Sequence, residues 1–207
     1  MSIRLLLVRH GNTFEKGQPP VQIGSRTDLP LTNEGRNQAK TVGGFFLSQN
    51  IVPKGIYSGS LKRQYESAQI IAKELSLDNL FFPNEPALTE IDYGLWEGLT
   101  AEEIAAKWPE EYRKWTTSID WPAGIFEGSH HHHINAIDKW LDHLRKKYQS
   151  GDTLIAVTSN GVIQYFRPDR TKNDKVKTGH FCELHIHPDS LTIEKWNAAP
   201  NIDTQTR

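Results

Sequence analysis

Residues 3–8 read Ile-Arg-Leu-Leu-Leu-Val, and this apolar run stops at Arg9-His10-Gly11. A short run of this kind is typical of a β-strand that is covered on both faces of a sheet. A sheet with two covered faces needs helices on each side, so the chain should alternate between strands and helices. The first run therefore predicts an α/β protein with a strand close to its N-terminus.

The rest of the sequence follows the expected alternation. Apolar residues recur at helical spacing after Asn33 and after Leu61, and Thr100 with Glu103 has the spacing of a capping box at the start of a third helix. Ser60 is expected to cap the second helix. Further expected elements are strands at 55–58, 80–83, 153–157, 181–186 and 191–196, and a long helix over 134–148.

This order of elements predicts a three-layer α/β sandwich, with a mainly parallel central sheet flanked by helices. The length of 207 residues fits a single domain spanning residues 1–207. Residues 108–128 are rich in Trp, Pro and Gly, so a small irregular insertion is expected at about 95–128.

Polar clusters follow three of the predicted strands. They are residues 9–13, residues 58–63 and residues 158–161. Ligands of open α/β sheets bind beyond the carboxyl ends of the strands. The three clusters therefore predict one shared site at that edge of the sheet.

Charge and cysteine content narrow the classes of partner. The chain has 24 basic and 25 acidic residues and no long basic tract, so nucleic acid is not an expected partner. The N-terminal apolar run is too short to span a bilayer, so we expect no membrane-spanning segment. Cys182 is the one cysteine, which fits a reducing compartment, and we expect a cytoplasmic protein.

Arg9-His10-Gly11 combines residue types that suit phosphate chemistry. A neutral histidine acts as a nucleophile when one ring nitrogen is held by a hydrogen bond. Arginine offers planar donors to phosphate oxygens, and glycine allows the backbone to approach an anion. Taken alone, the tripeptide equally fits a surface Arg-His pair at the end of a strand.

The chain resembles the phosphoglycerate mutase-like family of the histidine phosphatase superfamily over nearly its whole length. Four segments, in the same order along the chain, carry the resemblance. The first is Arg9-His10-Gly11 after an apolar strand. The others are Asp28-Leu-Pro-Leu-Thr-Asn-Glu-Gly35 with Gln38-Ala39, Ser58-Gly-Ser-Leu-Lys-Arg63, and Glu90-Ile-Asp-Tyr-Gly-Leu-Trp-Glu-Gly98. The resemblance implies a phosphoryl-transfer enzyme that needs no cofactor and no metal.

The resemblance also implies roles. His10 would attack phosphorus and carry a phosphohistidine, Arg9 and Arg63 would bind the phosphoryl oxygens, and Glu90 would act as the acid and base. Asn12 follows the histidine and is a further candidate donor to phosphate.

One segment departs from the family pattern. The run Val157-Thr-Ser-Asn-Gly-Val-Ile163 resembles the family's Val-Ser-His-Gly-Gly-Val-Ile, so Ser159 stands where relatives have a second histidine. A neutral hydroxyl makes a weaker hydrogen bond than a charged imidazole, which would slow phosphoryl transfer. His180 is a candidate to take over as the phosphate-binding histidine.

These features predict a phosphatase that acts on small phosphomonoesters through His10. The alternative is a catalytically impaired relative that binds phosphate or a protein partner, and Ser159 favours it. A third possibility is a phosphoglycerate mutase. It is less favoured, because the sequence has no extra basic segment to retain a bisphosphate. Successive residues of the run His130–His133 point around a helix at about 100° steps, so a metal site there is not expected.

Overall fold

The computed structural model describes residues 2–82, 84–167 and 173–201 of the chain. Within these residues, six strands form one sheet in the order β3-β2-β4-β1-β5-β6. The strands are β1 (Ile3–Arg9), β2 (Gly55–Ser58), β3 (Phe81–Phe82), β4 (Thr153–Thr158), β5 (Phe181–Ile186) and β6 (Leu191–Ala198). The helices are α1 (Asn33–Ser48), α2 (Lys62–Glu74), α3 (Ala101–Lys107), α4 (Pro109–Ser118), α5 (His130–Lys147) and α6 (Asn160–Ile163).

Strand direction makes the sheet mixed. β3, β2, β4 and β1 pair in parallel, whereas β5 runs antiparallel to β1 and β6 antiparallel to β5. The expected strands, including the short one at 80–83 and the final pair, are present apart from small shifts at their ends, and residue 83 lies outside the described residues. Because β1, β2 and β4 are parallel, their carboxyl ends meet at one edge of the sheet, as predicted from the polar clusters.

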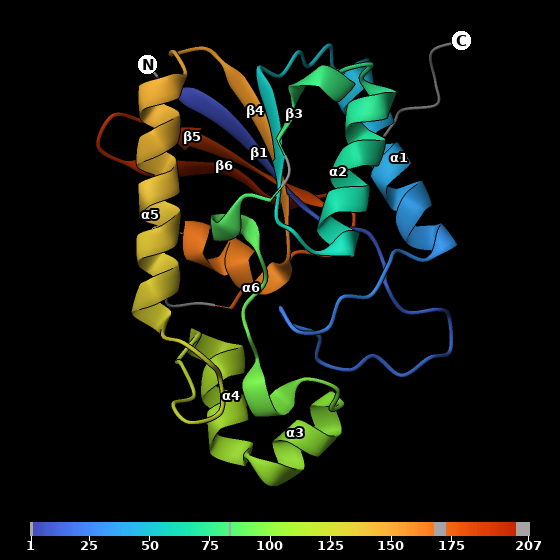
Figure 1. Cartoon of the computed structure of the whole chain (residues 1–207), viewed down its shortest axis with the longest axis vertical. Coiled ribbons are helices and arrows are strands. Elements are labelled where there is room, and N and C mark those ends of the chain that lie inside the picture. Colours follow the sequence, from blue (N-terminus) through green and yellow to red (C-terminus); the bar gives the residue numbers. More distant parts are fainter. Residues whose placement is uncertain (1, 83, 168–172, 202–207) are drawn as a thin grey trace.

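The apolar run of β1 supplies both faces of the core, because successive side chains of a strand point to opposite faces. Leu5 and Leu7 belong to a cluster that contains the buried face of α5, while Leu6 and Val8 belong to a second cluster with α1 and α2. Figure 1 shows α5 on one side of the sheet and α1 and α2 on the other. The predicted three-layer α/β sandwich is confirmed.

The segment after Glu90 is more regular than its composition suggested. Residues 101–118 form α3 and α4, and Figure 1 shows both helices together beyond one end of the sheet. Pro109 is the first residue of α4, a position where the missing N–H costs nothing. The prediction of an irregular insertion at about 95–128 is therefore wrong for α4, whereas α3 is the third helix that the capping box predicted. Both helices form one wall of the site described below.

The two predicted helix caps have different outcomes. Thr100 accepts a hydrogen bond from the Glu103 N–H, and the Glu103 carboxylate accepts one from the Thr100 N–H, so the capping box is confirmed. Ser60 does not cap α2, which begins at Lys62. The Ser60 hydroxyl lies instead 3.3 Å from the Thr89 hydroxyl, because the turn before α2 packs against the segment that leads to Glu90.

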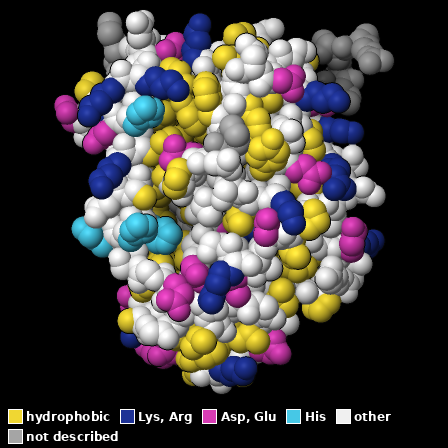
Figure 2. Space-filling model, viewed as in Figure 1, with side chains coloured by type: hydrophobic (Ala, Val, Ile, Leu, Met, Phe, Trp, Pro, Cys, Tyr) yellow, Lys and Arg dark blue, Asp and Glu magenta, His cyan; other side chains and the backbone are white. Residues whose placement is uncertain are grey.

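Charged side chains of both signs are interspersed on the face of the molecule shown in Figure 2, without a continuous basic field. None of the helices in the described residues has the length and apolar character needed to cross a membrane.

Gly35 is a point where helix α1 touches the loop that follows β1. A Cβ at this position would overlap the carbonyl group of Asn12, which is backbone and cannot swing aside. In an open helix, alanine would be favoured over glycine by about 1 kcal/mol. We expect the cost of this overlap to exceed the gain in helix propensity. Gly35→Ala should therefore lower the free energy of unfolding by about 1–3 kcal/mol.

Urea unfolding followed by circular dichroism measures this change. Lys40→Ala, on the exposed side of the same helix, is the control and should stay within about 0.5 kcal/mol of wild type. A Gly35→Ala protein as stable as wild type would show that the loop after β1 is not held against α1.

Candidate active site

His10 is fixed at the carboxyl end of β1 by hydrogen bonds at both its backbone and its ring. Its N–H donates to the Thr158 carbonyl at 3.0 Å, and its Nδ1 lies 2.8 Å from the Gly11 carbonyl oxygen. A carbonyl only accepts, so Nδ1 carries the hydrogen and Nε2 keeps a free lone pair. The side chain is 4 % exposed, and it lines a cavity.

The surroundings keep this imidazole neutral. Burial, and then the charges of Arg63 and Arg9, lower the pKa of His10 well below its ordinary value. A neutral imidazole with a free Nε2 lone pair is the form that attacks an electrophile. The lowered pKa therefore favours the neutral state of His10 that a nucleophile needs.

Two arginines flank His10. Arg9 lines the cavity, and its Nη1 donates to the Val176 carbonyl at 2.6 Å. Arg63 is fully buried, and its two terminal nitrogens donate to the carbonyl groups of Thr27 and Gly24 at 2.8 and 3.1 Å. The Nε atoms of both arginines are buried without a hydrogen-bond partner among the described residues.

The arginines thus hold positive charge beside His10 while they tie down two separate segments. Burial lowers the pKa of each guanidinium, and the charge of Glu90 opposes the shift. Arginine stays protonated in proteins all the same. Sequence reasoning placed both residues at the site, and the structure has Arg9, but not Arg63, among the residues that line the cavity. The carbonyl groups that they bind had no signal in the sequence, since those groups belong to loops.

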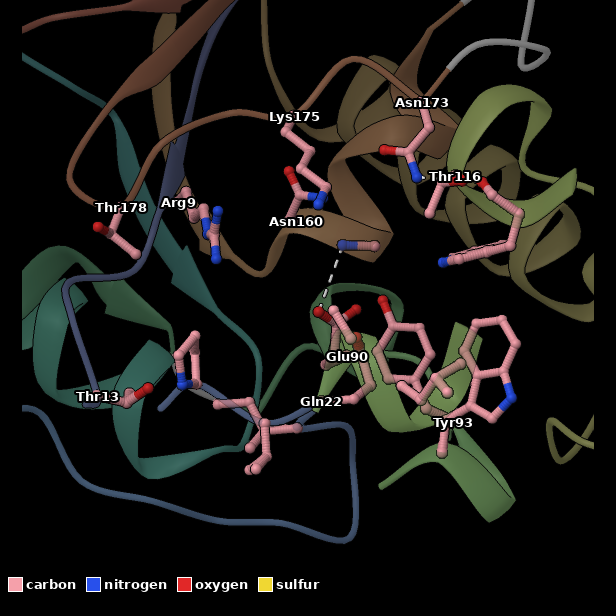
Figure 3. Close-up of a pocket in the computed structure, with 18 of the residues that line it drawn as sticks. Arg9, Thr13, Gln22, Glu90, Tyr93, Thr116, Asn160, Asn173, Lys175 and Thr178 are labelled. Carbon is pink, nitrogen blue, oxygen red and sulfur yellow. Dashed lines mark hydrogen bonds between the residues drawn. The ribbon is translucent and has the colours of Figure 1, made fainter. Parts of the chain in front are cut away.

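Glu90 lines the same cavity with a side chain that is buried. One carboxylate oxygen accepts from the Ile91 N–H at 2.9 Å and the other from the Gly161 N–H at 3.3 Å. Figure 3 shows the second bond as a dashed line, with Tyr93 beside Glu90. Burial raises the pKa of Glu90 although Arg63 opposes the shift, so its carboxyl group keeps a proton to higher pH than an exposed glutamate.

Asn12 lines the cavity next to His10. Its N–H donates to the Gln38 side-chain oxygen at 2.9 Å, and its own side-chain oxygen is 3.4 Å from the Thr178 hydroxyl. Since that oxygen accepts, the amide NH₂ group is the part of Asn12 that is left to donate to a ligand.

Ser159 is fully buried and is not one of the residues that line the cavity. Its hydroxyl oxygen accepts from the Gln64 amide at 2.8 Å, and the same amide donates to the Leu88 carbonyl. Gln64 is a residue that sequence reasoning missed. No local pattern distinguishes it, because its partner lies 95 positions away in the chain.

His180 does not meet His10 in the cavity. It lines a separate cavity of about 260 Å³, and its Nδ1 lies 3.0 Å from the Asn197 carbonyl oxygen. The His180 carbonyl, rather than the ring, reaches β1 by accepting from the Arg9 N–H. The structure therefore gives no support to His180 as a phosphate-binding residue, because β5 enters the sheet with that ring turned toward α1.

The histidine run opens α5 after Ser129, which caps the helix. His133 packs against the rings of Trp121 and Tyr165, and burial together with its neighbouring histidines lowers its pKa to about 4. In the described part of the chain, no group of three or more His, Cys, Asp or Glu side chains is arranged to hold a metal ion.

The cavity has a volume of about 340 Å³, at the lower end of the range for small-molecule sites. Arg9, His10 and Glu90 together line one end of it. Its other end lies against the insertion and the loop before α1. The side chains of that outer part include Phe14, Val21, Ile23, Trp96, Ile104, Tyr112 and Trp115.

The chain is similar to proteins of one family over almost its full length. A family model described as the histidine phosphatase superfamily (branch 1) matches residues 5–199. Phosphoserine phosphatase 1 of Hydrogenobacter thermophilus is 28% identical over 159 residues, which cover 75% of this chain and 70% of the relative. The 2,3-bisphosphoglycerate-dependent phosphoglycerate mutase of Azorhizobium caulinodans is 32% identical over 199 residues, covering 92% and 96%.

Solved structures show the same fold. A mycobacterial glucosyl-3-phosphoglycerate phosphatase superposes with a TM-score of 0.79 at 21% identity, covering 95% of this chain and 99% of that one. A Bacillus stearothermophilus protein named YhfR gives a TM-score of 0.76 at 20% identity, covering 94% and 96%.

Proposed function

The chain belongs to the histidine phosphatase superfamily, and from this premise we propose that it hydrolyses small phosphomonoesters through a phosphohistidine on His10. The observation that carries the proposal is the hydrogen bond between Nδ1 of His10 and the Gly11 carbonyl, which leaves Nε2 free to attack. Relatives named as phosphatases support the same reaction class.

The reaction has two steps. The Nε2 lone pair forms a bond to phosphorus while the bond from phosphorus to the ester oxygen breaks, and Glu90 gives its proton to the departing alcohol. Water then attacks the phosphohistidine, Glu90 takes a proton from that water, and the bond between phosphorus and Nε2 breaks. Inorganic phosphate leaves, and His10 and Glu90 return to their starting states.

Arg9 and Arg63 would stabilise the charge on the phosphoryl oxygens during both steps. Phosphoryl transfer depends mainly on positioning and charge stabilisation, for which a pair of guanidinium groups suffices. Asn12 would add an amide donor. We propose no cofactor, and hydrolysis should therefore persist in the presence of a chelator.

The cavity volume favours a small substrate. We also propose a cytoplasmic protein, because Cys182 is the one cysteine of the sequence and so forms no disulfide within the chain, as is typical of a reducing compartment.

A second candidate function is phosphate binding without turnover. It is favoured by Ser159, whose hydroxyl is engaged by Gln64. Release of phosphate from p-nitrophenyl phosphate with a chelator present, from about pH 4 to about pH 8, separates the two. Turnover supports the phosphatase. Silence on this ester and on a panel of natural phosphomonoesters, combined with measurable phosphate binding, would leave the binding function.

Mutase activity is the third candidate, since a phosphoglycerate mutase is among the relatives. Conversion of 3-phosphoglycerate to 2-phosphoglycerate with added 2,3-bisphosphoglycerate tests it. A rate above that of phosphate release would replace the phosphatase proposal by a mutase one.

Ser159 itself gives a further prediction. Its oxygen accepts from Gln64, so its hydroxyl hydrogen is left to donate. Ser159 does not line the cavity, so it can affect phosphoryl transfer only through the neighbours that it positions, and Ser159→Ala should lower kcat/KM by less than about tenfold. Steady-state kinetics measure the change, with Ser60→Ala as the control outside the cavity. An unchanged kcat/KM would mean that Ser159 serves only to hold Gln64.

A further inference from the structure

Residues 173–178 form a strap across the outer part of the cavity, and the strap is fixed by hydrogen bonds to the site. The Val176 N–H donates to the Asn160 side-chain oxygen at 2.9 Å, and the Val176 carbonyl accepts from Arg9. The Asp174 N–H donates to the Gln164 side-chain oxygen at 3.0 Å. Because the residues on both sides of Lys175 are tied down, its backbone is held at one place beside the cavity.

Lys175 lines the cavity, and none of the ion pairs among the described residues includes it. The other cation in the lining is Arg9, and the acid is Glu90. Figure 3 shows Lys175 extending from the strap toward Asn160, across the cavity from Glu90 and Tyr93. Because Lys175 is exposed whereas His10 and Glu90 are buried, its positive charge lies on the solvent side of the cavity.

Asn160 adds a donor at the same place. Its side-chain oxygen accepts from the Val176 N–H and from the Gln164 amide. The amide nitrogen of Asn160 must then face the other way, since the two halves of the amide are fixed by their partners. The residue lines the cavity, and no hydrogen bond of that nitrogen occurs within the described chain.

We propose that Lys175 and Asn160 bind a second anionic group of the substrate, either a carboxylate or a second phosphoryl group. The proposal rests on the phosphatase function above. An ammonium and an amide NH₂ offer hydrogen-bond donors and no acceptor, so they select a negatively charged oxygen over a neutral hydroxyl. The substrate is then a phosphomonoester whose alcohol part carries a negative charge.

Matched pairs of esters test this selectivity. 3-Phosphoglycerate carries a carboxylate where glycerol 3-phosphate carries a hydroxymethyl group. Fructose 1,6-bisphosphate and fructose 6-phosphate differ in a second phosphoryl group. The measured quantity is the ratio of kcat/KM within each pair. The pair with a ratio well above one identifies which anion the site accepts.

Lys175→Met keeps the length of the side chain and removes its charge. Loss of a charge-assisted hydrogen bond should lower the ratio by about 10- to 100-fold, mainly through KM. Asn160→Asp keeps the acceptor for the Val176 N–H while it repels an anion, so it should lower the ratio as well. Lys175→Arg should retain it, and Lys177→Met, an exposed lysine outside the cavity lining, should match wild type.

The outcomes separate the two proposals. If wild type hydrolyses these esters but both ratios are near one, or if Lys175→Met leaves them unchanged, the anion site is wrong and the phosphatase stands. If wild type hydrolyses neither these esters nor p-nitrophenyl phosphate and the panel of natural phosphomonoesters, the phosphatase has failed. Calorimetric titration then decides the anion site: tighter binding of 3-phosphoglycerate than of glycerol 3-phosphate, lost in Lys175→Met, supports it, and equal binding overturns it.

Discussion

His10→Ala is expected to lower kcat for phosphomonoester hydrolysis by about 10⁴-fold or more, because the substitution removes the atom that forms the bond to phosphorus. Arg9 and Arg63 would still bind phosphate, so KM should change far less than kcat. The measurement is phosphate release from p-nitrophenyl phosphate under saturating substrate.

A trapping experiment identifies the intermediate as well. After rapid denaturation in base, wild type should carry a phosphoryl group that is stable to base and labile to acid, as expected for a bond between phosphorus and nitrogen. His10→Ala should carry none. His143→Ala, on the exposed side of α5, is the matched control and should behave as wild type in both assays. Retention of a tenth or more of the wild-type kcat by His10→Ala would rule out His10 as the nucleophile.

Glu90→Gln is expected to lower kcat/KM for alkyl phosphates by about 10²- to 10⁴-fold, since glutamine cannot give a proton to the departing alcohol. The loss should be much smaller for p-nitrophenyl phosphate, whose leaving group needs little protonation. A comparison of alkyl and aryl esters therefore separates an acid from a residue that holds the fold. Glu102→Gln, exposed on α3, is the control. An equal loss on both esters would contradict the assignment of Glu90 as the acid.

The pH profile provides an independent check on Glu90. Burial raises the pKa of Glu90, so its protonated form persists above the ordinary range of a glutamate and is lost as pH rises through the raised pKa. The pKa of His10 is lowered, so neutral imidazole persists below the ordinary range of a histidine and is lost as pH falls through the lowered pKa. For wild type on an alkyl phosphate, kcat/KM should therefore be bell-shaped.

Glu90→Gln should lose the alkaline limb of this profile and keep the acidic one. The measurement is kcat/KM for an alkyl phosphate from about pH 4 to about pH 8. Survival of the alkaline limb in the variant would assign that limb to another group.

Local patterns in the sequence were sufficient for much of this protein. The apolar run of β1, the capping box at Thr100 and the alternation of strands and helices each depend on residues within a few positions of one another. They predicted the α/β sandwich and the edge of the sheet where the site lies. His10, Arg9 and Glu90 were proposed as site residues because their short motifs resemble those of a family, and all three line one cavity.

Prediction from local composition and residue type was wrong at two places. Residues 108–128 are rich in Trp and Pro, which suggested an irregular segment, yet Pro109 begins the regular helix α4. Ser60 had the right residue type for a helix cap, but a contact with Thr89 placed its hydroxyl elsewhere. In both cases a tertiary contact or a position within the helix decided the outcome, and residue type alone did not contain that information.

By itself, the sequence predicted the strands, the longer helices and the residues proposed as nucleophile and acid, because each of these signals is carried by neighbouring residues. Only the tertiary structure decided the partners of Ser159, the carbonyl groups that Arg63 binds, the turn of His180 away from the cavity and the approach of Lys175 to Asn160. These contacts join segments far apart in the chain, so they exist only after the sheet has paired and the loops have been packed against its edge.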